Sequence, residues 1–485
     1  MSSLKPLSGT FEKPINEREN IPVNNPVTGE MIETVPCMTE ADIDLAVKQA
    51  QKGQQEWAAK HQMERNRILR NFAELILSRR AELGKLLCRE NGKRISEAEE
   101  EFDTVAALIE SYCDKASHLY GISLPNGTDA TSCNQDAIFT RYEPIGVVAC
   151  LLPFNFPVEL CGHKIAPALA AGNSVIIKPP TDCPLAVIKL VECLHEAGVP
   201  EWAAQVVTGR GSVIGDALVS HPGIAAITMT GSSETGAHIA QLAAKNLTRC
   251  YFELGGNDAF VVMEDADIDL TIVQALESRV NNAGQVCCAS KRYIVHQSVA
   301  EEFISKLIAA LSSLKIGDPA DRSMDVGGMI SEKARDEVLK QISHTVEQGA
   351  KLVYGGKPQG KNFLIPAVLT DVTEDMDVAK DMEIFGAVFP ILTYKTAEDA
   401  LRMVNASPYG LNSAVFSKDM AKAISFAEHV QAGGVVINGG GNYRTATMPF
   451  GGYKKSGIGR EGTSRTLLEF VQEKSYVLKN VLGNI

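Results

Sequence analysis

The early part of the chain carries the hydrophobic spacing of amphipathic helices. Ile43, Val47 and Ala50 share one helix face, and the segment 39–42 ahead of them predicts a variant of the capping box. The same period continues through a second set of apolar positions, after which Gly92 offers a helix C-cap. That second set consists of Ile68, Phe72, Leu75, Ile76, Leu83 and Leu87.

From residue 146 onward the pattern changes to short apolar runs separated by helical stretches. Residues 158–171 and 184–197 have helical spacing and are each followed by glycine. Apolar strands that alternate with helices indicate a parallel sheet covered on both faces, and such sheets bind ligands at the carboxyl ends of their strands. The predicted strands lie at 147–152, 175–177, 205–208, 224–228 and 250–254, with a short helix at 215–220.

A second series of the same kind follows, and a hairpin precedes both. Its predicted strands lie at 260–263, 292–296, 388–394, 413–416 and 434–438. Between 120 and 142 a polar stretch contains Pro125, Asn126 and Gly127, and the alternation that ends at Thr140 and Tyr142 predicts a β-hairpin projecting from the body. The sequence therefore predicts an α/β protein with two bodies and a hairpin arm.

Composition and charge narrow the class of protein. The 485 residues are 45% hydrophobic and 22% charged, which excludes a disordered or collagen-like chain, and the net charge of -12 argues against a nucleic-acid partner or an anionic membrane surface. No apolar run approaches the ~20 residues needed to span a bilayer. The polar start with Glu12, Glu17 and Glu19 fits neither a signal peptide nor a mitochondrial presequence, so a cytoplasmic location is expected.

The cysteines predict a reduced protein without a metal site. There are 11, an odd number, with no CxxC pair and no metal-ligand spacing with the nine histidines. Most are expected to be small buried residues. Cys287 and Cys288 differ, because they follow Gly284 in a polar turn whose N–H groups would favour a thiolate. The pattern alone leaves open which of the two is chemical.

Two further polar residues stand at the ends of predicted strands. Asn155 lies between Pro153 and Pro157, so its amide is presented in a rigid turn and suits an oxyanion donor; the alternative is an ordinary helix N-cap. Glu253 ends an apolar strand before Gly255, where burial would raise its pKa and suit it to general-base catalysis. The alternative for Glu253 is a carboxylate in solvent.

A dinucleotide signal lies in the same body. Residues 228–236 follow a strand and open a helix, and Gly231, Ser232 and Gly236 there are typical of a phosphate cradle at a helix N-terminus. The segment is not GxGxxG, so it is weak evidence by itself. Lys178 ends the neighbouring strand, from which a lysine can reach a ribose or a phosphate.

Together these segments closely resemble the aldehyde dehydrogenase superfamily over nearly the whole chain. The semialdehyde, lactaldehyde and non-phosphorylating glyceraldehyde-3-phosphate branches look most similar. The resemblance implies a Rossmann-like dinucleotide-binding domain, an α/β catalytic domain and a β-hairpin oligomerisation arm. The matching segments are 24–29, 153–157, 178–179, 231–236, 253–256, 284–287, 383–386 and 449–452.

The resemblance also implies a mechanism and settles the choice of cysteine. The family nucleophile is the cysteine two places after the glutamine, which is Cys287; its thiolate attacks the aldehyde carbon to give a thiohemiacetal. Asn155 and the Cys287 backbone N–H would stabilise the oxyanion, and Glu253 would activate the water that hydrolyses the thioester. The branches that transfer the acyl group to coenzyme A generally lack this base, so a free acid product is expected.

The expected cofactor is NADP or NAD. Lys178 and Glu383 resemble the ribose-binding pair of the family, and Ser232 and Phe385 resemble residues beside the pyrophosphate and the nicotinamide. Members that prefer NAD often carry Glu three places after the lysine, where this chain has Thr181, so NADP is favoured. The full expected cofactor set is Phe154, Lys178, Thr181, Gly211, Gly231, Ser232, Gly236, Leu254, Glu383 and Phe385.

The expected substrate is a small polar or anionic aldehyde. His163 stands where the succinic semialdehyde branch usually has an arginine, which argues against the strictest form of that specificity. Arg444 precedes the segment that borders the substrate tunnel in the family and is able to bind an anionic tail, unless it is an ordinary surface residue. Phe156 and Phe450 complete the expected substrate set.

Two other enzyme classes and a binding protein are alternative functions for this fold. A coenzyme A-acylating enzyme or a thiol hydrolase would use the same cysteine, and a binding protein would keep only the fold. The expected cofactor domain comprises 1–119 and 143–254, the catalytic domain 255–455, and the oligomerisation arm and tail 120–142 and 456–485. The tail can add a strand to a partner's sheet, so a homodimer or homotetramer follows from the resemblance.

Overall fold

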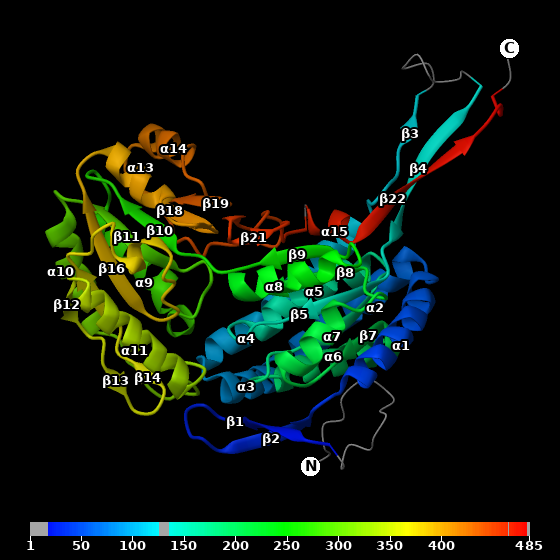
Figure 1. Ribbon diagram of the computed structural model, residues 1–485, viewed down its shortest axis with the longest axis horizontal. Coiled ribbons are helices and arrows are strands. Elements are labelled where there is room, and N and C mark those ends of the chain that lie inside the picture. The colour runs from blue at the N-terminus through cyan, green and yellow to red at the C-terminus, as the bar shows by residue number, and fades with distance from the viewer. Residues whose placement is uncertain (1–17, 126–134, 464, 483–485) are drawn as a thin grey trace.

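The computed structural model describes residues 18–125, 135–463 and 465–482. Two α/β bodies lie side by side, and a narrow arm projects from one of them (Figure 1). Within the described residues, no helix is both long and apolar enough to cross a membrane. The tip of the predicted hairpin, with Asn126 and Gly127, and the acidic residues up to Glu17 lie outside the described residues.

The first body is built on a six-stranded sheet. Its strand order is β21-β9-β8-β5-β6-β7, and all neighbours are parallel except the edge pair β21 and β9. Because the parallel strands point the same way, their carboxyl ends meet at one edge of the sheet. The strands are β5 (Val147–Leu151), β6 (Ser174–Lys178), β7 (Ala204–Val206), β8 (Ala226–Thr230), β9 (Arg249–Glu253) and β21 (Gly457–Ile458).

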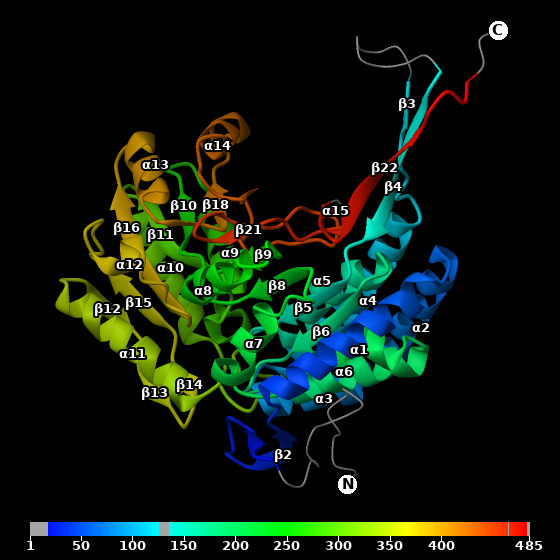
Figure 2. The same ribbon diagram turned by 45° about the vertical axis from the view of Figure 1, so that its right-hand side comes forward.

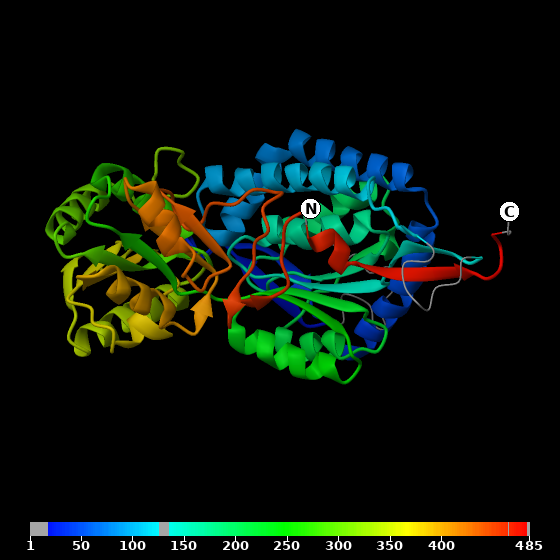
Figure 3. The same cartoon turned by 90° about the horizontal axis from the view of Figure 1, so that it is seen from above.

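Helices cover both faces of this sheet, as the view from above shows (Figure 3). Val148 and Cys150 of β5 belong to one buried cluster, and Val147 and Ala149 belong to another, because alternate strand residues face opposite sides. The first cluster packs against α2 (Gln62–Ser78), α3 (Arg80–Asn91), α4 (Ile95–Ala116), α5 (Pro157–Ala170) and α6 (Leu185–Ala197). The second packs against α1 (Glu40–Ala58), α7 (Asp216–Val219) and α8 (Ser233–Ala244).

The second body contains a seven-stranded sheet of order β12-β15-β16-β11-β10-β18-β19, parallel except at β12. Its strands are β10 (Asp258–Val262), β11 (Ser290–His296), β12 (Lys351–Tyr354), β15 (Ala367–Thr370), β16 (Val388–Tyr394), β18 (Asn412–Phe416) and β19 (Gly434–Ile437). Its helices are α9 (Ile268–Val280), α10 (Ala300–Ser312), α11 (Glu332–Glu347), α12 (Asp377–Lys380), α13 (Ala397–Asn405) and α14 (Met420–Ala427).

The arm is a three-stranded antiparallel sheet of order β22-β4-β3. β22 (Val471–Leu478) pairs with β4 (Ala137–Pro144) over eight residue pairs, and β3 (Ser123–Leu124) adds a short edge. Both views show the arm extending away from the body, with the C-terminal strand lying along it (Figures 1 and 2). α15 (Thr466–Glu469) leads into β22 from the first body.

The predicted α/β class is confirmed, and most of the predicted elements are present. The capping box at Thr39 and Asp42 forms at α1, and Gly92 adopts a left-handed conformation as the C-cap of α3. The predicted strand 224–228 was placed too early, because the Ile224 N–H donates to the His221 carbonyl in a turn and β8 begins at Ala226. The expected helix 215–220 is a π-helical turn, Gly211–Gly215, followed by the single turn α7.

Several short elements were not predicted. The chain opens with a hairpin of β1 (Asn20–Asn24) and β2 (Met31–Pro36) before α1. Two pairs of two-residue strands also occur. β13 (Pro358–Gln359) pairs with β14 (Phe363–Leu364), and β17 (Tyr409–Gly410) pairs with β20 (Tyr453–Lys454). The expected domain limits stay a prediction.

Candidate active site

Two cavities meet at Cys287. One has a volume of about 800 Å³ and the other about 470 Å³, and among the residues that line them Cys287 alone lines both. The turn between β5 and α5 lies between the cavities, since Phe154 and Asn155 line the larger one and Phe156 the smaller. The thiol of Cys287 can therefore meet one ligand from each side.

The larger cavity lies where β5, β6 and β8 end and α8 begins. Ser232 is the N-cap of α8, and its hydroxyl accepts a hydrogen bond of 3.2 Å from the Thr235 N–H. Of the expected cofactor residues, Phe154, Lys178, Gly211, Gly231, Ser232, Glu383 and Phe385 line this cavity. Thr181, Gly236 and Leu254 are not among its lining residues.

The larger cavity has the features of a dinucleotide site. Its size suits an extended ligand, the α8 N-terminus offers backbone N–H groups to a phosphate, and a Cβ at Gly255 would come within 2.5 Å of Glu383 Oε2. Burial lowers the pKa of Lys178, and Asp182 opposes that shift. A dinucleotide therefore fits the residues present.

The sequence did not point to two other residues of this cavity. Asp216 and His238 both line it, and His238 Nε2 lies 3.0 Å from Asp216 Oδ1. They stand on α7 and α8, and they are 22 residues apart in the chain. No local motif marks such a pair, because it forms only when the two helices pack together.

The smaller cavity contains all four residues expected to bind substrate, namely Phe156, His163, Arg444 and Phe450. Arg444 Nη2 lies 2.8 Å from Glu461 Oε2 and 3.1 Å from His163 Nδ1, and its guanidinium lies 4.2 Å from the centre of the Phe450 ring. Arg444 Nε is buried and has no hydrogen-bond partner among the described residues. Arg444 is thus largely enclosed rather than an ordinary surface arginine. One edge of its guanidinium forms an ion pair with Glu461.

His163 is a neutral side chain in this setting. Burial, followed by the charge of Arg444, lowers its pKa well below the ordinary value. Since Arg444 donates to Nδ1, the proton sits on Nε2, which lies 4.0 Å from Glu159 Oε1. His163 therefore presents a donor, not a cation, toward Glu159.

The surroundings of Cys287 act on its thiol in opposite directions, and its preference for the thiolate stays a prediction. A hydrogen bond with Cys288 and then burial raise the pKa of Cys287 well above its ordinary value. Lys291 lowers it, but the Lys291 ammonium is engaged by the Cys287 carbonyl and by Glu383 Oε1, the latter at 3.1 Å. The neighbouring sulfur and the loss of water thus raise the pKa of Cys287, and the charge of Lys291 opposes them.

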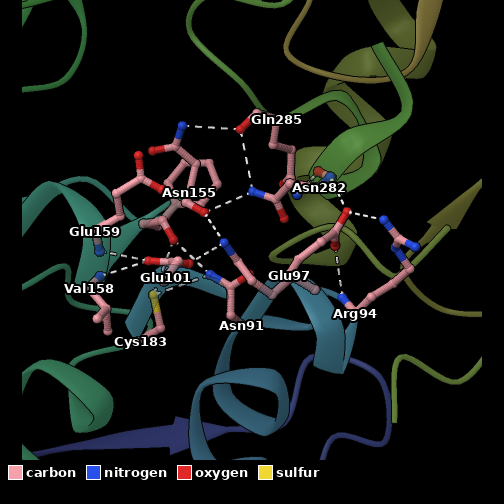
Figure 4. Close-up of polar contacts among 12 residues, drawn as sticks. Asn91, Arg94, Glu97, Glu101, Asn155, Val158, Glu159, Cys183, Asn282 and Gln285 are labelled. Carbon is pink, nitrogen blue, oxygen red and sulfur yellow. Dashed lines mark hydrogen bonds and ion pairs between the residues drawn. The ribbon is translucent and has the colours of Figure 1, made fainter. Parts of the chain in front are cut away.

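Asn155 is not a helix cap. The N-cap of α5 is Phe156, and the first N–H groups of that helix donate to the Glu101 side chain instead. Asn155 Nδ2 donates to the Gln285 carbonyl at 3.1 Å, which leaves the second N–H of the amide available in the larger cavity beside Cys287. Figure 4 shows this amide directed at the loop that carries Gln285.

Glu253 ends β9 and is buried, with 4% of its surface exposed. Burial, and then the charge of Glu461, raise the pKa of Glu253 well above its ordinary value, while Arg444 and Lys164 oppose the shift. Its Oε2 has no hydrogen-bond partner within the part of the chain that the structure describes. The alternative of a carboxylate in solvent is therefore wrong.

A buried charge network that the sequence did not reveal stands behind Glu253. Lys164 Nζ contacts Glu461 Oε1 at 3.0 Å and Thr230 Oγ1 at 2.7 Å, and Arg444 contacts the other oxygen of Glu461. Although burial raises the pKa of Glu461, the charges of Lys164 and Arg444 outweigh it and lower that pKa, so Glu461 is ionised. This fixed negative charge is part of what raises the pKa of Glu253.

No group of three or more His, Cys, Asp or Glu side chains that could hold a metal ion occurs in residues 18–125, 135–463 and 465–482. The ten cysteines in these ranges are free thiols, and Cys287 is one of the three that are not fully buried.

Comparison with known proteins gives a consistent result. Residues 14–476 match the model of the aldehyde dehydrogenase family. The chain is 36% identical over 460 residues to a 3-sulfolactaldehyde dehydrogenase of Priestia aryabhattai, covering 95% of each chain. It is 35% identical over 461 residues to the NADP(+) succinate-semialdehyde dehydrogenase of Escherichia coli, covering 95% of this chain and 94% of that one.

The solved structures agree. The NADP-dependent glyceraldehyde-3-phosphate dehydrogenase of Bacillus halodurans, in complex with NADP, is 38% identical with a TM-score of 0.92, and the match covers 95% of this chain and 96% of that one. The fold and the site define an oxidoreductase that acts on the aldehyde group with a nicotinamide dinucleotide. The chain belongs to the aldehyde dehydrogenase family.

Proposed function

We propose that this enzyme converts a small polar aldehyde to the free carboxylic acid through covalent catalysis at Cys287. The Cys287 sulfur forms a bond to the aldehyde carbon, and the thiol proton leaves, to give a thiohemiacetal. Lys178, Ser232 and Glu383 line the larger cavity and would hold a nicotinamide dinucleotide there, which would supply the acceptor for the hydride of that carbon. The thioester that remains on Cys287 is then hydrolysed, which frees the thiol and releases the acid.

The observation that carries this proposal is the place of Cys287 at the junction of the two cavities. Hydride transfer requires the reacting carbon to contact the nucleophile on one side and the dinucleotide on the other. A thiol that lines only one cavity would not meet this requirement. Asn155, which lines the larger cavity beside it, has one amide N–H available for the oxyanion, together with the Cys287 backbone N–H.

Glu253 is the proposed base for hydrolysis of the thioester. Its raised pKa places proton uptake nearer to neutral pH than an ordinary carboxylate would, as general-base catalysis needs. A base that activates water favours the free acid over transfer to coenzyme A. The coenzyme A-acylating and thiol hydrolase readings are not favoured.

For the cofactor, we infer a preference for NADP over NAD, with Thr181 as the residue that permits it. Thr181 follows Lys178 at the end of β6, where a neutral hydroxyl does not repel a 2′-phosphate as a carboxylate would. Two relatives have names or structures that refer to NADP, which supports this assignment.

For the substrate, we propose an aldehyde whose polar tail reaches the smaller cavity. Arg444 lines this cavity, and its guanidinium can bind an anionic or hydroxylated tail there. His163, Phe156 and Phe450 also line this cavity. Relatives named for sulfolactaldehyde, succinate semialdehyde and glyceraldehyde 3-phosphate support a small polar substrate of this kind.

We further propose that the enzyme is a homodimer or homotetramer in the cytoplasm. The arm is narrow and presents an open strand edge, to which a second copy of the chain can add its own strand. The free thiols among the described residues suit a reducing compartment.

The test is a panel of aldehydes with NADP⁺ and with NAD⁺, without coenzyme A. The panel contains succinic semialdehyde, glutaric semialdehyde, lactaldehyde and glyceraldehyde 3-phosphate. We expect the absorbance of the reduced nicotinamide to rise with at least one of them, and the matching free acid to accumulate. No rise until coenzyme A is added, or acid formed without reduced nicotinamide, would contradict the proposal.

A further inference from the structure

The main chain of Asn155 is held by two donors from different bodies. Lys93 Nζ donates to the Asn155 carbonyl at 2.6 Å, and Asn282 Nδ2 donates to the same oxygen at 2.8 Å. Lys93 follows α3 in the first body, whereas Asn282 follows α9 in the second. Figure 4 shows Asn282 and Asn155 facing one another across the gap between the two loops.

Lys93 is a buried cation surrounded by specific partners. None of its surface is exposed, and its ammonium contacts Glu101 and lies 3.9 Å from the centre of the Phe156 ring. Glu101 Oε2 in turn accepts the N–H groups of Val158 and Glu159 at 2.9 and 3.0 Å. Burying this pair is costly, and its contacts beyond the pair itself go to the segment 155–159.

Asn282 is held in an unusual backbone conformation. Its φ of 47° and ψ of 39° lie in the left-handed region, and Ala283 beside it has φ of 55°. Glu97 Oε1 accepts the Asn282 N–H at 2.9 Å, which anchors this turn to α4. The strained backbone lies in the segment that leads to Cys287. Contacts with the first body, such as that of Glu97, hold this segment in its conformation.

We propose that Lys93 and Asn282 are positioning residues for Asn155, holding its main chain so that its amide keeps one N–H on Gln285 and the other at the oxyanion. The proposal rests on the proposed role of Asn155. Neither residue touches the reacting atoms. The Asn282 contact also ties the oxyanion donor to the loop that carries the nucleophile, which fixes the spacing of the two groups.

The first test is Asn282→Gly, which removes the amide but keeps a residue that tolerates the left-handed conformation. We expect the single-turnover rate of reduced nicotinamide formation, with the best aldehyde of the panel, to fall by about 10- to 100-fold. Alkylation of Cys287 by iodoacetamide forms a carbon–sulfur bond and releases iodide, with no oxyanion, and should stay within about twofold if Asn155 alone has shifted.

Asn438→Gly is the matched control. Asn438 also has a left-handed φ of 57°, and its side chain hydrogen-bonds Ser417, yet it lies after β19 and lines neither cavity. We expect this variant to retain the wild-type rate of nicotinamide reduction. If Asn282→Gly and Asn438→Gly lose equal rate, or if alkylation falls in parallel with reduction, the effect is structural and the proposal is overturned.

The second test addresses Lys93. Lys93→Met alone would leave Glu101 buried without its cation, so the double variant Lys93→Met and Glu101→Gln is used; the new side-chain amide can still accept the two N–H groups at the start of α5 through its oxygen. We expect a loss of the single-turnover rate comparable to that of Asn282→Gly, again with alkylation preserved. A wild-type rate in this folded variant would refute the role of Lys93.

Asn155→Ala separates this proposal from the proposed function. If Asn155→Ala leaves the single-turnover rate unchanged, Asn155 is not the oxyanion donor and the proposed function is wrong at that residue. If Asn155→Ala lowers the rate about 100-fold or more while the Lys93 and Asn282 variants do not, the positioning proposal alone fails.

Discussion

At the scale of single residues, Cys287 and Cys288 make the sharpest contrast. They are adjacent in the chain, yet Cys287 lines both cavities, whereas Cys288 lines only the smaller one and is buried. Their hydrogen bond raises the pKa of Cys287, so Cys288 affects the nucleophile without replacing it.

We expect Cys287→Ala to abolish aldehyde oxidation and Cys288→Ala to leave most of it. Only the first variant removes the sulfur that forms the covalent bond to substrate. Reduced nicotinamide formed in the steady state measures both. A comparable loss in the two variants would contradict the assignment of the nucleophile.

Glu253 makes the reaction depend on pH in a definite direction. Burial and the charge of Glu461 raise its pKa, and only the ionised carboxylate can accept a proton from water. Thioester hydrolysis should therefore rise as the pH rises through a pKa above the ordinary 4.5 of a glutamate. In Glu253→Gln this dependence should vanish.

The same variant should slow turnover by about 100-fold or more while it spares the first turnover, because the base acts after the hydride has left. A burst of reduced nicotinamide followed by a slow steady rate, measured by stopped flow, is the expected result. Equal slowing of burst and steady rate would place Glu253 in an earlier step instead.

Thr181 carries the cofactor prediction. Thr181→Glu would place a carboxylate near the 2′ position and repel a phosphate there, so the ratio of kcat/KM for NADP⁺ to that for NAD⁺ should fall by about 10-fold or more. Thr181→Ser keeps the hydroxyl and serves as the control. Because Thr181 does not line the larger cavity, the effect requires the 2′ end of the ligand to extend past that lining. An unchanged ratio in Thr181→Glu would disprove the assignment.

At the scale of secondary structure, the helix start at Thr39 gives a direct test of the local signals. The Thr39 hydroxyl accepts the Asp42 N–H at 3.3 Å, and the Asp42 side chain accepts the Thr39 N–H at 2.8 Å. Thr39→Ala should lower the free energy of unfolding by about 1 kcal/mol, seen as a lower urea midpoint. Thr39→Ser keeps the cap and should stay close to wild type; equal losses in both would show that packing, not capping, is responsible.

Local patterns predicted the elements better than the contacts between them. The period of 3.6 marks α1 to α3, and the apolar runs mark β5, β6 and β16, because each depends on neighbours in the chain. The β1 and β2 hairpin was missed although the buried Ile21 and Val23 alternate with exposed positions in β1, since so short a strand gives too short a pattern.

The proposed catalytic residues carry local signals, although the family resemblance was needed to choose Cys287 over Cys288, and the residues that support them carry none. Asn155, Glu253 and Cys287 each lie in a segment with its own sequence signal. Lys93 lies 62 residues from Asn155, and Asn282 lies 127 residues from it. Such contacts depend on the packing of distant elements, which no local pattern encodes. The ion pair between Arg444 and Glu461 could not be predicted for the same reason.

At the scale of the whole molecule, the arm leaves apolar side chains exposed. Val477 is 53% exposed and Leu478 is 46% exposed, and Leu124 on the opposite edge is 41% exposed. Phe139 and Tyr476 stack with ring centres 5.0 Å apart, which stiffens the sheet that carries these residues. Exposed apolar side chains on a rigid strand pair suit contact with another copy.

We therefore expect Val477→Asp to shift the assembly toward smaller species in sedimentation velocity, because a buried charge at an interface is unfavourable. Glu473→Gln, on the same strand and also exposed, is the control and should sediment like the wild type. Unchanged sedimentation of Val477→Asp would show that this part of the arm lies outside any interface.

The junction at Cys287 has a consequence for inhibition. Because the two cavities share a single lining residue, a compound that occupies one need not displace a ligand from the other. A mimic of the dinucleotide should thus leave the apparent affinity for the aldehyde intact, and the reverse should hold for a mimic of the aldehyde tail. A single inhibitor that fills both cavities would gain affinity from the high effective concentration of its second group. The linker between its two groups would have to pass close to the Cys287 sulfur.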